Sequence, residues 1–340
     1  MIAQDEFIDR IILHVMKAQQ GKAFCDDIFS DTIMQPGNNE FLFFIKPEIT
    51  MPSDRVKLDA VLKLIYQKLD AYGLVVRHIK ILSAAYLKQY NIIAQHYGVI
   101  NQLASNASKH LSLSAREKFL AVYGQRVEDV KVLGGLEFLD QYPALDAWAL
   151  NELWQDGEFI KLAGGTYCMK LSHENETIYL VNGFHPKQLL HFTQENRSIV
   201  VMTLSGDTPW RVARNDFIGA TMPDNAKSGS LRREFLDRQN ELGLPDISPS
   251  ANGVHLSAGP VEGLVELRRY NSDLSNPDQI LGLSDFSFGR ALLDAFSPAD
   301  VERITSNTNL LVDGREVSVF DLTEEMDSDE AIKTLVHHFT

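Results

Sequence analysis

The sequence has little cysteine and no long hydrophobic run. Only Cys25 and Cys168 occur among the 340 residues, and they are far apart. Two such thiols form neither a disulfide framework nor the spacing of a zinc site, so we expect two ordinary, partly buried thiols. The longest apolar runs, such as 199–202, are far too short to cross a bilayer. The chain is therefore not expected to span a membrane.

Positive charge is also scarce, because 32 Lys and Arg residues face 46 Asp and Glu residues and the formal net charge is -14. General nucleic-acid binders and proteins that dock on anionic membranes need a cationic face, so both classes are disfavoured. Asp5, Glu6 and Asp9 stand where a secretory signal would be basic. These features predict a soluble, cytoplasmic protein. A nucleotide pocket stays compatible, since nearby Lys and Arg set its local field.

Several familiar catalytic motifs are missing. The sequence contains no Gly-x4-Gly-Lys-Ser/Thr phosphate loop, no Gly-x-Gly-x-x-Gly, no His-Glu-x-x-His and no Gly-x-Ser-x-Gly. No residue set has the spacing of a protein-held metal site. A phosphate-binding site in this chain would have to use side chains in place of a glycine-rich cradle.

The hydrophobic pattern predicts two β-α-β halves separated by a long interval. Short apolar runs at 41–46, 74–82, 199–204 and 252–255 are typical of strands. Helical spacing predicts helices at 53–72, 83–97, 208–219 and 260–267, with Ser53 as the cap of the first and Gly98 closing the second. This order predicts an α+β fold: a ferredoxin-like βαββαβ antiparallel sheet with helices on one face.

Four segments follow from this pattern. Residues 1–38 form an N-terminal helical leader, and 39–98 with 184–271 form the split domain. Residues 99–183 form an inserted segment with helices around 138–154 and a β-hairpin of 166–171 with 177–181. Residues 272–340 form a C-terminal extension, with a hairpin that turns at Asp313-Gly314.

Cationic and hydroxyl side chains gather between positions 210 and 255. They are Arg211, Arg214, Thr221, Lys227, Arg232 and Arg233, and Asn252 and His255 follow. Arginine presents a fork of donors that fits phosphate oxygens, and threonine adds a hydroxyl. Loop residues 219–223 and 228–232 can wrap a polyphosphate.

On these residues the sequence resembles the nucleoside diphosphate kinase family. The matching features are Lys46-Pro47 at a strand end, Gly219-Ala220-Thr221-Met222-Pro223 after a helix, Arg232 within Gly229-Ser230-Leu231-Arg232, Asn252-Gly253-Val254-His255-Leu256-Ser257, and Glu266. Their order along the chain is that of the family. The resemblance covers residues 40–97 and 184–270.

The resemblance implies phosphoryl transfer from a nucleoside triphosphate to a nucleoside diphosphate through a phosphohistidine at His255. Glu266 would fix the tautomer of the ring, and Mg²⁺ would be bound through the nucleotide phosphates. Lys46, Thr221, Arg232 and Arg214 would hold the phosphates, and Asn252 would contact the sugar and Lys46. Tyr97 and Phe184 would clamp the base, with Tyr90 as a competitor for Tyr97. A homo-oligomer is also implied.

The sequence departs from the family pattern at several positions. Asn215 occupies the position of a phosphate-binding arginine, and Arg214 is one residue away, which turns a helical side chain by about 100°. Ala258 stands where the family has aspartate, and Leu256 where it has glycine. The inserted segment separates Tyr97 from Phe184.

Other interpretations remain open. Lys46 could be an ordinary surface lysine at a strand end, and Glu266 could pair with Arg268 or Arg269 on its own helix. The whole protein could be a catalytically weak nucleotide-binding or scaffold protein on the same fold. It could also relay phosphate from a histidine to a protein partner.

Overall fold

The computed structural model describes residues 2–31, 37–53 and 55–339. The chain divides into two compact units, one of Met1–Tyr90 with Glu195–Thr340 and one of Asn91–Gln194. The second unit extends past both ends of the 99–183 range expected for the insertion. Among the described residues, no helix is long and apolar enough to cross a membrane.

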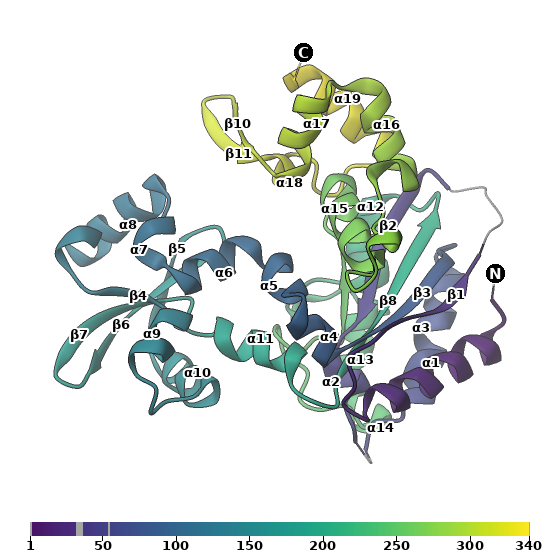
Figure 1. Ribbon diagram of the computed structural model, residues 1–340, viewed down its shortest axis with the longest axis horizontal. Helices are drawn as coiled ribbons and strands as arrows, with labels where there is room; N and C mark the ends of the chain where they lie inside the picture. The colour runs from purple at the N-terminus through teal and green to yellow at the C-terminus, as the bar shows by residue number, and fades with distance from the viewer. Residues whose placement is uncertain (1, 32–36, 54, 340) are drawn as a thin grey trace. The chain divides into compact units, whose positions relative to one another are not determined.

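The first unit is built on a five-stranded antiparallel sheet, and the protein is of the α+β class. The strands are β1 (Cys25–Ser30), β2 (Asn39–Ile45), β3 (Val75–Ser83), β8 (Ser198–Gly206) and β9 (Val254–Leu256). Their order in the sheet is β1-β3-β8-β2-β9, and each neighbouring pair is antiparallel. Figure 1 shows β1, β3, β8 and β2 side by side. The four strands expected from the sequence are all present.

Helices connect and cover these strands. They are α1 (Gln4–Ala18), α2 (Pro47–Thr50), α3 (Leu58–Ala71), α4 (Ala84–Gln89), α12 (Trp210–Val212), the π-helix η2 (Ala213–Ile218), η3 (Pro223–Asn225), α13 (Leu231–Asp237), α14 (Gln239–Leu242) and α15 (Pro260–Asn271). Phe41 and Phe43 of β2 point to one face of the sheet, where they contact Trp210 of α12 and Phe217 of η2. The main hydrophobic core lies at this interface.

The expectation of helices on one face only is wrong. Phe44, which alternates with Phe43 along β2, packs on Tyr270 of α15, with ring centroids 5.5 Å apart. Successive side chains of a strand point to opposite faces, so α15 covers the face opposite the main core. The physical reason is the continuous apolar run 41–45, which leaves no polar face for water.

The expected leader 1–38 holds more than a helix. α1 is present as expected and buries Phe7, Ile11 and Val15. Strand β1 follows it and pairs with β3, with an irregularity between Asp27 and Phe29. The sequence of β1 is mostly polar, which suits an edge strand. A polar segment has no clear apolar periodicity, so the sequence pattern did not predict this strand.

Two expected helix boundaries are also wrong. α3 begins at Leu58, and the Ser53 hydroxyl accepts from the amides of Arg55 and Val56 in a turn before it. The expected helix 83–97 stops at Gln89, because Asn91 adopts a left-handed φ of 52°. Local backbone conformations of this kind interrupt a helix without disturbing its apolar spacing.

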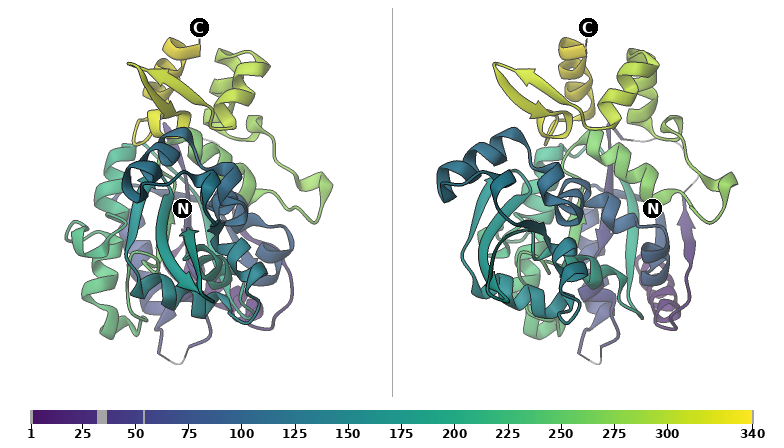
Figure 2. Two further views of the ribbon diagram at one scale, coloured as in Figure 1. Left: turned by 90° about the vertical axis from the view of Figure 1, so that its left-hand side faces the viewer. Right: turned by 60° about the vertical axis from the view of Figure 1, so that its left-hand side comes forward.

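The C-terminal residues of the first unit are mainly helical. They form η4 (Pro277–Gln279), η5 (Leu283–Asp285), α16 (Ser287–Ala295), α17 (Pro298–Thr305), β10 (Asn309–Val312), β11 (Arg315–Ser318), α18 (Val319–Leu322) and α19 (Ser328–Phe339). Figure 2 shows them in yellow and light green. The expected hairpin is confirmed, since Asp313 and Gly314 both have positive φ between β10 and β11.

The second unit has a four-stranded sheet of order β4-β7-β6-β5 with helices around it. Its elements are α5 (Ile92–His96), α6 (Gly98–Ser105), α7 (Ala107–His110), α8 (Leu113–Tyr123), η1 (Val127–Asp129), β4 (Val132–Gly134), α9 (Gly135–Gln141), α10 (Ala147–Asp156), β5 (Phe159–Ala163), β6 (Thr166–His173), β7 (Glu176–Val181) and α11 (His185–Thr193). The expected hairpin of β6 and β7 is confirmed, and β4 and β5 extend it. Gly98 begins α6 and does not end a helix.

We predict that Phe43→Ala destabilises the first unit by about 3–5 kcal/mol, because it removes a fully buried ring and leaves a cavity. The measurement is the urea midpoint of unfolding followed by tryptophan fluorescence. Leu311→Ala is the control, because this side chain is 73% exposed and its loss should change stability by less than about 0.5 kcal/mol. Equal midpoints for the two variants would contradict this description of the core.

Candidate functional site

The candidate site is built around β9, a strand of three residues. β9 pairs with β2 so that Phe44 lies opposite His255 and Ile45 opposite Val254. The backbone amide of Lys46 continues the pairing by donating to the Gly253 carbonyl over 2.8 Å. This pairing brings together two segments about 200 residues apart in the sequence.

Gly253 allows the chain to enter β9 at this point. Its φ is 82°, and a Cβ there would lie 2.6 Å from the Phe235 ring. Both the left-handed backbone and the lack of space favour glycine. The Gly253 amide donates to Oε1 of the buried Glu48 over 2.8 Å. Sequence reasoning missed Glu48, although its position two residues after Lys46 was a signal.

Two neighbouring side chains hold the His255 ring. Its ring stacks on Phe44, with centroids 4.5 Å apart and planes 19° apart. Its Nε2 lies 3.0 Å from Oε2 of Glu266, and the Ser257 hydroxyl donates to the same oxygen over 2.6 Å. Glu266 is only 2% exposed. A carboxylate here favours the tautomer with hydrogen on Nε2.

The Glu266 contacts decide between the two sequence interpretations of this residue. Its carboxylate bonds to His255 and Ser257, which come from β9 and the turn after it. A pair with Arg268 or Arg269 on the helix surface would need an exposed carboxylate, and that of Glu266 is buried. α15 therefore presents Glu266 to the strand and not to solvent.

Lys46 is buried, so its interpretation as a surface lysine is wrong. It is 6% exposed, and its Nζ donates to Oδ1 of Asn252 over 2.7 Å. Burial lowers the pKa of Lys46 to about 8; the charge of Glu48 opposes this shift and that of Arg232 adds to it. The ammonium is thus charged at neutral pH and loses its proton more easily than an exposed lysine.

Asn252 and Arg232 tie the 219–221 loop to this strand. The Asn252 amide group donates to the Thr221 carbonyl over 3.1 Å. Arg232 is 5% exposed and donates to the carbonyls of Gly219 and Val254 over 2.8 and 3.1 Å. The Thr221 residue itself is exposed. Lys46, Arg232 and Asn252 therefore form one connected group at the start of β9.

Arg214 reaches the same strand from the π-helix η2. Its Nη1 donates to the Leu256 carbonyl over 3.0 Å, one residue after His255. A π turn holds one more residue than an α turn, because its hydrogen bonds run from i to i+5. Arg214 and its neighbour Asn215 both lie within this π-helix. Asn215 instead donates to the Arg211 carbonyl and to Glu325.

Glu262 is a second carboxyl that sequence reasoning missed. Its Oε2 accepts from the Ala258 amide over 3.0 Å. Burial, together with the nearby charge of Glu266, raises the pKa of Glu262 to about 8. The spacing of four residues between Glu262 and Glu266 on α15 was the available signal. At neutral pH Glu262 is mainly protonated.

Tyr97 and Phe184 belong to the second unit. The Tyr97 ring lies 6.2 Å from that of His185 and 6.3 Å from that of Phe192. Phe184 packs in a hydrophobic cluster with Trp154 and Tyr167, at centroid distances of 5.9 and 6.1 Å. Tyr90, the competitor of Tyr97, packs against Tyr86 in the first unit, with ring centroids 4.7 Å apart and planes tilted by 50°.

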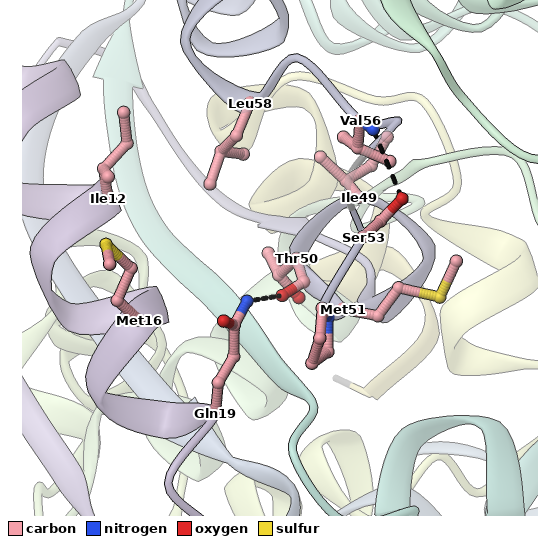
Figure 3. A pocket seen from close by; sticks show the side chains of 10 residues that line it. Ile12, Met16, Gln19, Ile49, Thr50, Met51, Ser53, Val56 and Leu58 are labelled. Atoms are coloured by element: carbon pink, nitrogen blue, oxygen red, sulfur yellow. Dashed lines mark hydrogen bonds between the residues drawn. The ribbon is translucent and has the colours of Figure 1, made fainter.

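A separate pocket of about 320 Å³ lies in the first unit between α1 and the segment that follows Lys46 (Figure 3). It is lined by Ile12, Met16, Gln19, Ile49, Thr50, Met51, Pro52, Ser53, Val56 and Leu58. None of these described residues is charged, and none belongs to the set expected from the sequence. The Gln19 amide donates across the pocket to the Thr50 carbonyl over 3.4 Å.

The lowered pKa of Lys46 predicts a pH dependence of stability. Between pH 8 and 10.5 the unfolded chain keeps this proton and the folded chain loses it, so the free energy of unfolding rises with pH. We expect wild type to gain up to about 3 kcal/mol relative to Lys46→Met between pH 7.5 and 10.5. Urea unfolding of both proteins at the two pH values measures this difference. Parallel pH profiles would show that Lys46 titrates normally.

Comparison with solved structures finds 24 chains that resemble this one. An NDP kinase from Pyrobaculum aerophilum aligns with 72% of this chain and 98% of its own, at 17% identity and a TM-score of 0.34. At that score the likeness is too distant to define the fold or the function. No protein-family model and no curated protein sequence matches the chain.

Proposed function

We propose that the protein is a nucleoside diphosphate kinase-type phosphotransferase, with His255 as the residue that carries the phosphate. The sheet order supports this proposal. Without the edge strand β1, the order β3-β8-β2-β9 and the connections through α3 and through η2 and α13 match a ferredoxin-like βαββαβ arrangement. Such folds serve many functions, so the site has to carry the argument.

The orientation of His255 is the observation that carries it. Oε2 of Glu266 bonds to Nε2 of His255, the Ser257 hydroxyl donates to the same oxygen, and Phe44 stacks on the face of the ring. A ring with hydrogen on Nε2 has its nucleophilic lone pair on Nδ1. Nδ1 is therefore the proposed acceptor of phosphate. A fixed tautomer also avoids the cost of reorienting the ring during reaction.

The proposed reaction has two displacements. Nδ1 of His255 attacks the terminal phosphorus of a nucleoside triphosphate, the N–P bond forms, and the nucleoside diphosphate leaves with the electrons of the broken P–O bond. A terminal oxygen of a second nucleoside diphosphate then attacks the same phosphorus and displaces the ring. Glu266 stabilises the positive charge that the phosphorylated ring develops.

The surrounding cations fit phosphate recognition. Lys46 has three N–H donors and gives one to Asn252, and Arg232 is buried beside it. We propose that these two residues, with Arg214 and Thr221, hold the phosphates. Asn252 would contact the sugar. The clamping of the base by Tyr97 and Phe184 stays a prediction from the family resemblance. Mg²⁺ would arrive with the nucleotide and be bound through its phosphates.

A catalytically weak nucleotide-binding protein is the second candidate. The observation in its favour is that Arg232 and Arg214 already donate to backbone carbonyls, and Arg214 also donates to Glu324. Ala258 also lacks a carboxylate. A relay of phosphate to a protein partner and assembly as a homo-oligomer are further proposals from the family resemblance.

Phosphate labelling tests the central proposal. Incubation with Mg²⁺ and γ-labelled ATP should produce an acid-labile, base-stable phosphoprotein, and His255→Gln should abolish the label. His337→Gln is the matched control, because His337 is exposed on α19 and should leave labelling unchanged.

The outcomes separate the candidates. Label that persists in His255→Gln rejects His255 as carrier. Saturable nucleotide binding without label favours the weak binding protein. Labelled protein that fails to pass phosphate to any nucleoside diphosphate favours the relay to a partner.

Glu266→Gln should slow phosphorylation of His255 by about ten- to a hundredfold, because an amide no longer favours the Nε2–H tautomer or stabilises the charged ring. Rapid-quench measurement of label formation gives the rate. Nucleotide affinity should change little, since Glu266 contacts His255 and Ser257. A rate equal to that of wild type would remove Glu266 from the mechanism.

A further inference from the structure

Residues 323–327, between α18 and α19, lie against the backbone that follows His255. The Glu325 amide donates to the Ala258 carbonyl over 2.9 Å. A Cβ on Gly259 would lie 2.5 Å from the Thr323 carbonyl oxygen, so the two backbones meet at a distance that glycine allows. Residues 323–327 therefore contact the chain three and four positions after His255, the proposed nucleophile.

Both ends of this segment are anchored. Thr323 is buried, and its hydroxyl donates to the Val319 carbonyl over 2.9 Å. At the other end Asp327 accepts from the Trp210 amide over 2.8 Å and from the Asn39 side chain over 3.0 Å. These bonds fix the segment on β2 and on the first residue of α12.

Between the anchors, the carboxylates of Glu324 and Glu325 face arginine side chains of α12 and η2. Oε1 of Glu324 lies 3.5 Å from Nη2 of Arg214. Oε2 of Glu325 lies 3.8 Å from Nε of Arg211, and its Oε1 accepts from Asn215 over 3.1 Å. Arg214 is one of the residues proposed above to hold phosphate. The Glu324 carboxylate therefore already contacts a guanidinium that a phosphate would use.

Carboxylate and phosphate oxygens compete for the same arginine donors. The two ion pairs are long, and Glu324 and Arg211 are largely exposed, so each pair is weak. A nucleoside triphosphate brings more negative charge to the same donors and is able to displace a weak contact. The anchors keep the displaced carboxylates nearby, so they can return when the nucleotide leaves.

We infer that residues 323–327 form an acidic strap, in which Glu324 and Glu325 occupy Arg214 and Arg211 and compete with nucleotide phosphates for them. This inference rests on the proposed function and names a regulation of that site. It assigns the C-terminal extension a role in setting nucleotide affinity.

The test compares nucleotide affinity in two variants of equal charge change. Glu324→Gln with Glu325→Gln removes the strap carboxylates. Asp294→Asn with Glu302→Gln is the control, because both residues are exposed on α16 and α17 of the same extension. Isothermal titration calorimetry with the magnesium complex of a non-hydrolysable ATP analogue measures the affinity. We expect the strap variant to bind about three- to tenfold more tightly than wild type, and the control to bind like wild type.

Hydrogen exchange provides a second readout. In wild type, nucleotide should speed exchange of the amides at 323–327, because it displaces the strap and loosens the Glu325 bond to Ala258. Equal affinities of wild type and the strap variant, or slower exchange at 323–327 on binding, would overturn the strap and leave nucleotide binding intact. Absence of binding by all three proteins would overturn the proposed function, and the strap with it.

Discussion

The pairing of β9 with β2 is the constraint on which the candidate site depends. Three residues of β9 set His255 opposite Phe44, and the Lys46 amide bonds to Gly253 at the end of the ladder. Asn252 then lies within reach of Nζ of Lys46. If this short ladder slipped by one residue, His255 would move to the main core face and Val254 would replace it beside α15. Register is therefore the feature that selects which side chain faces Glu266.

Buried charge is the second organising feature of the first unit. Lys46, Arg232, Glu48 and Glu266 are all nearly inaccessible to water. Isolated charges at such depth would be costly, and here they stand near opposite charges or accept and donate hydrogen bonds. The result is two groups, Lys46 and Glu262, whose pKa values both move to about 8. Burial drives both shifts toward the neutral form, downward for the base and upward for the acid. Such groups respond strongly to charge brought in by a ligand, which suits the proposed phosphate chemistry.

Apolar periodicity was enough to predict the four central strands, the N-terminal helix, α15 and both hairpins. Those elements have strong local patterns: the run 41–45, the regular spacing of Phe7, Ile11 and Val15, and the turn at Asp313-Gly314. β1 was missed because its sequence is polar, and the break at Asn91 was missed because apolar residues continue on both sides. The helix α15 on the second sheet face could have been inferred, because a strand without polar residues has to be covered by other elements on both faces of the sheet.

The sequence by itself determined the residue types of the site and their order: Lys46, the 219–232 loop, Asn252, His255 and Glu266. It could do so because donors, hydroxyls and an imidazole carry their chemistry in any fold. Only the tertiary structure decided which of them meet. Long-range strand pairing joined Lys46 to Asn252, the π-helix turned Arg214 toward β9, and packing buried Glu48 against the backbone amide of Gly253. These outcomes depend on backbone register and on desolvation, and both arise only when segments far apart in the chain pack together.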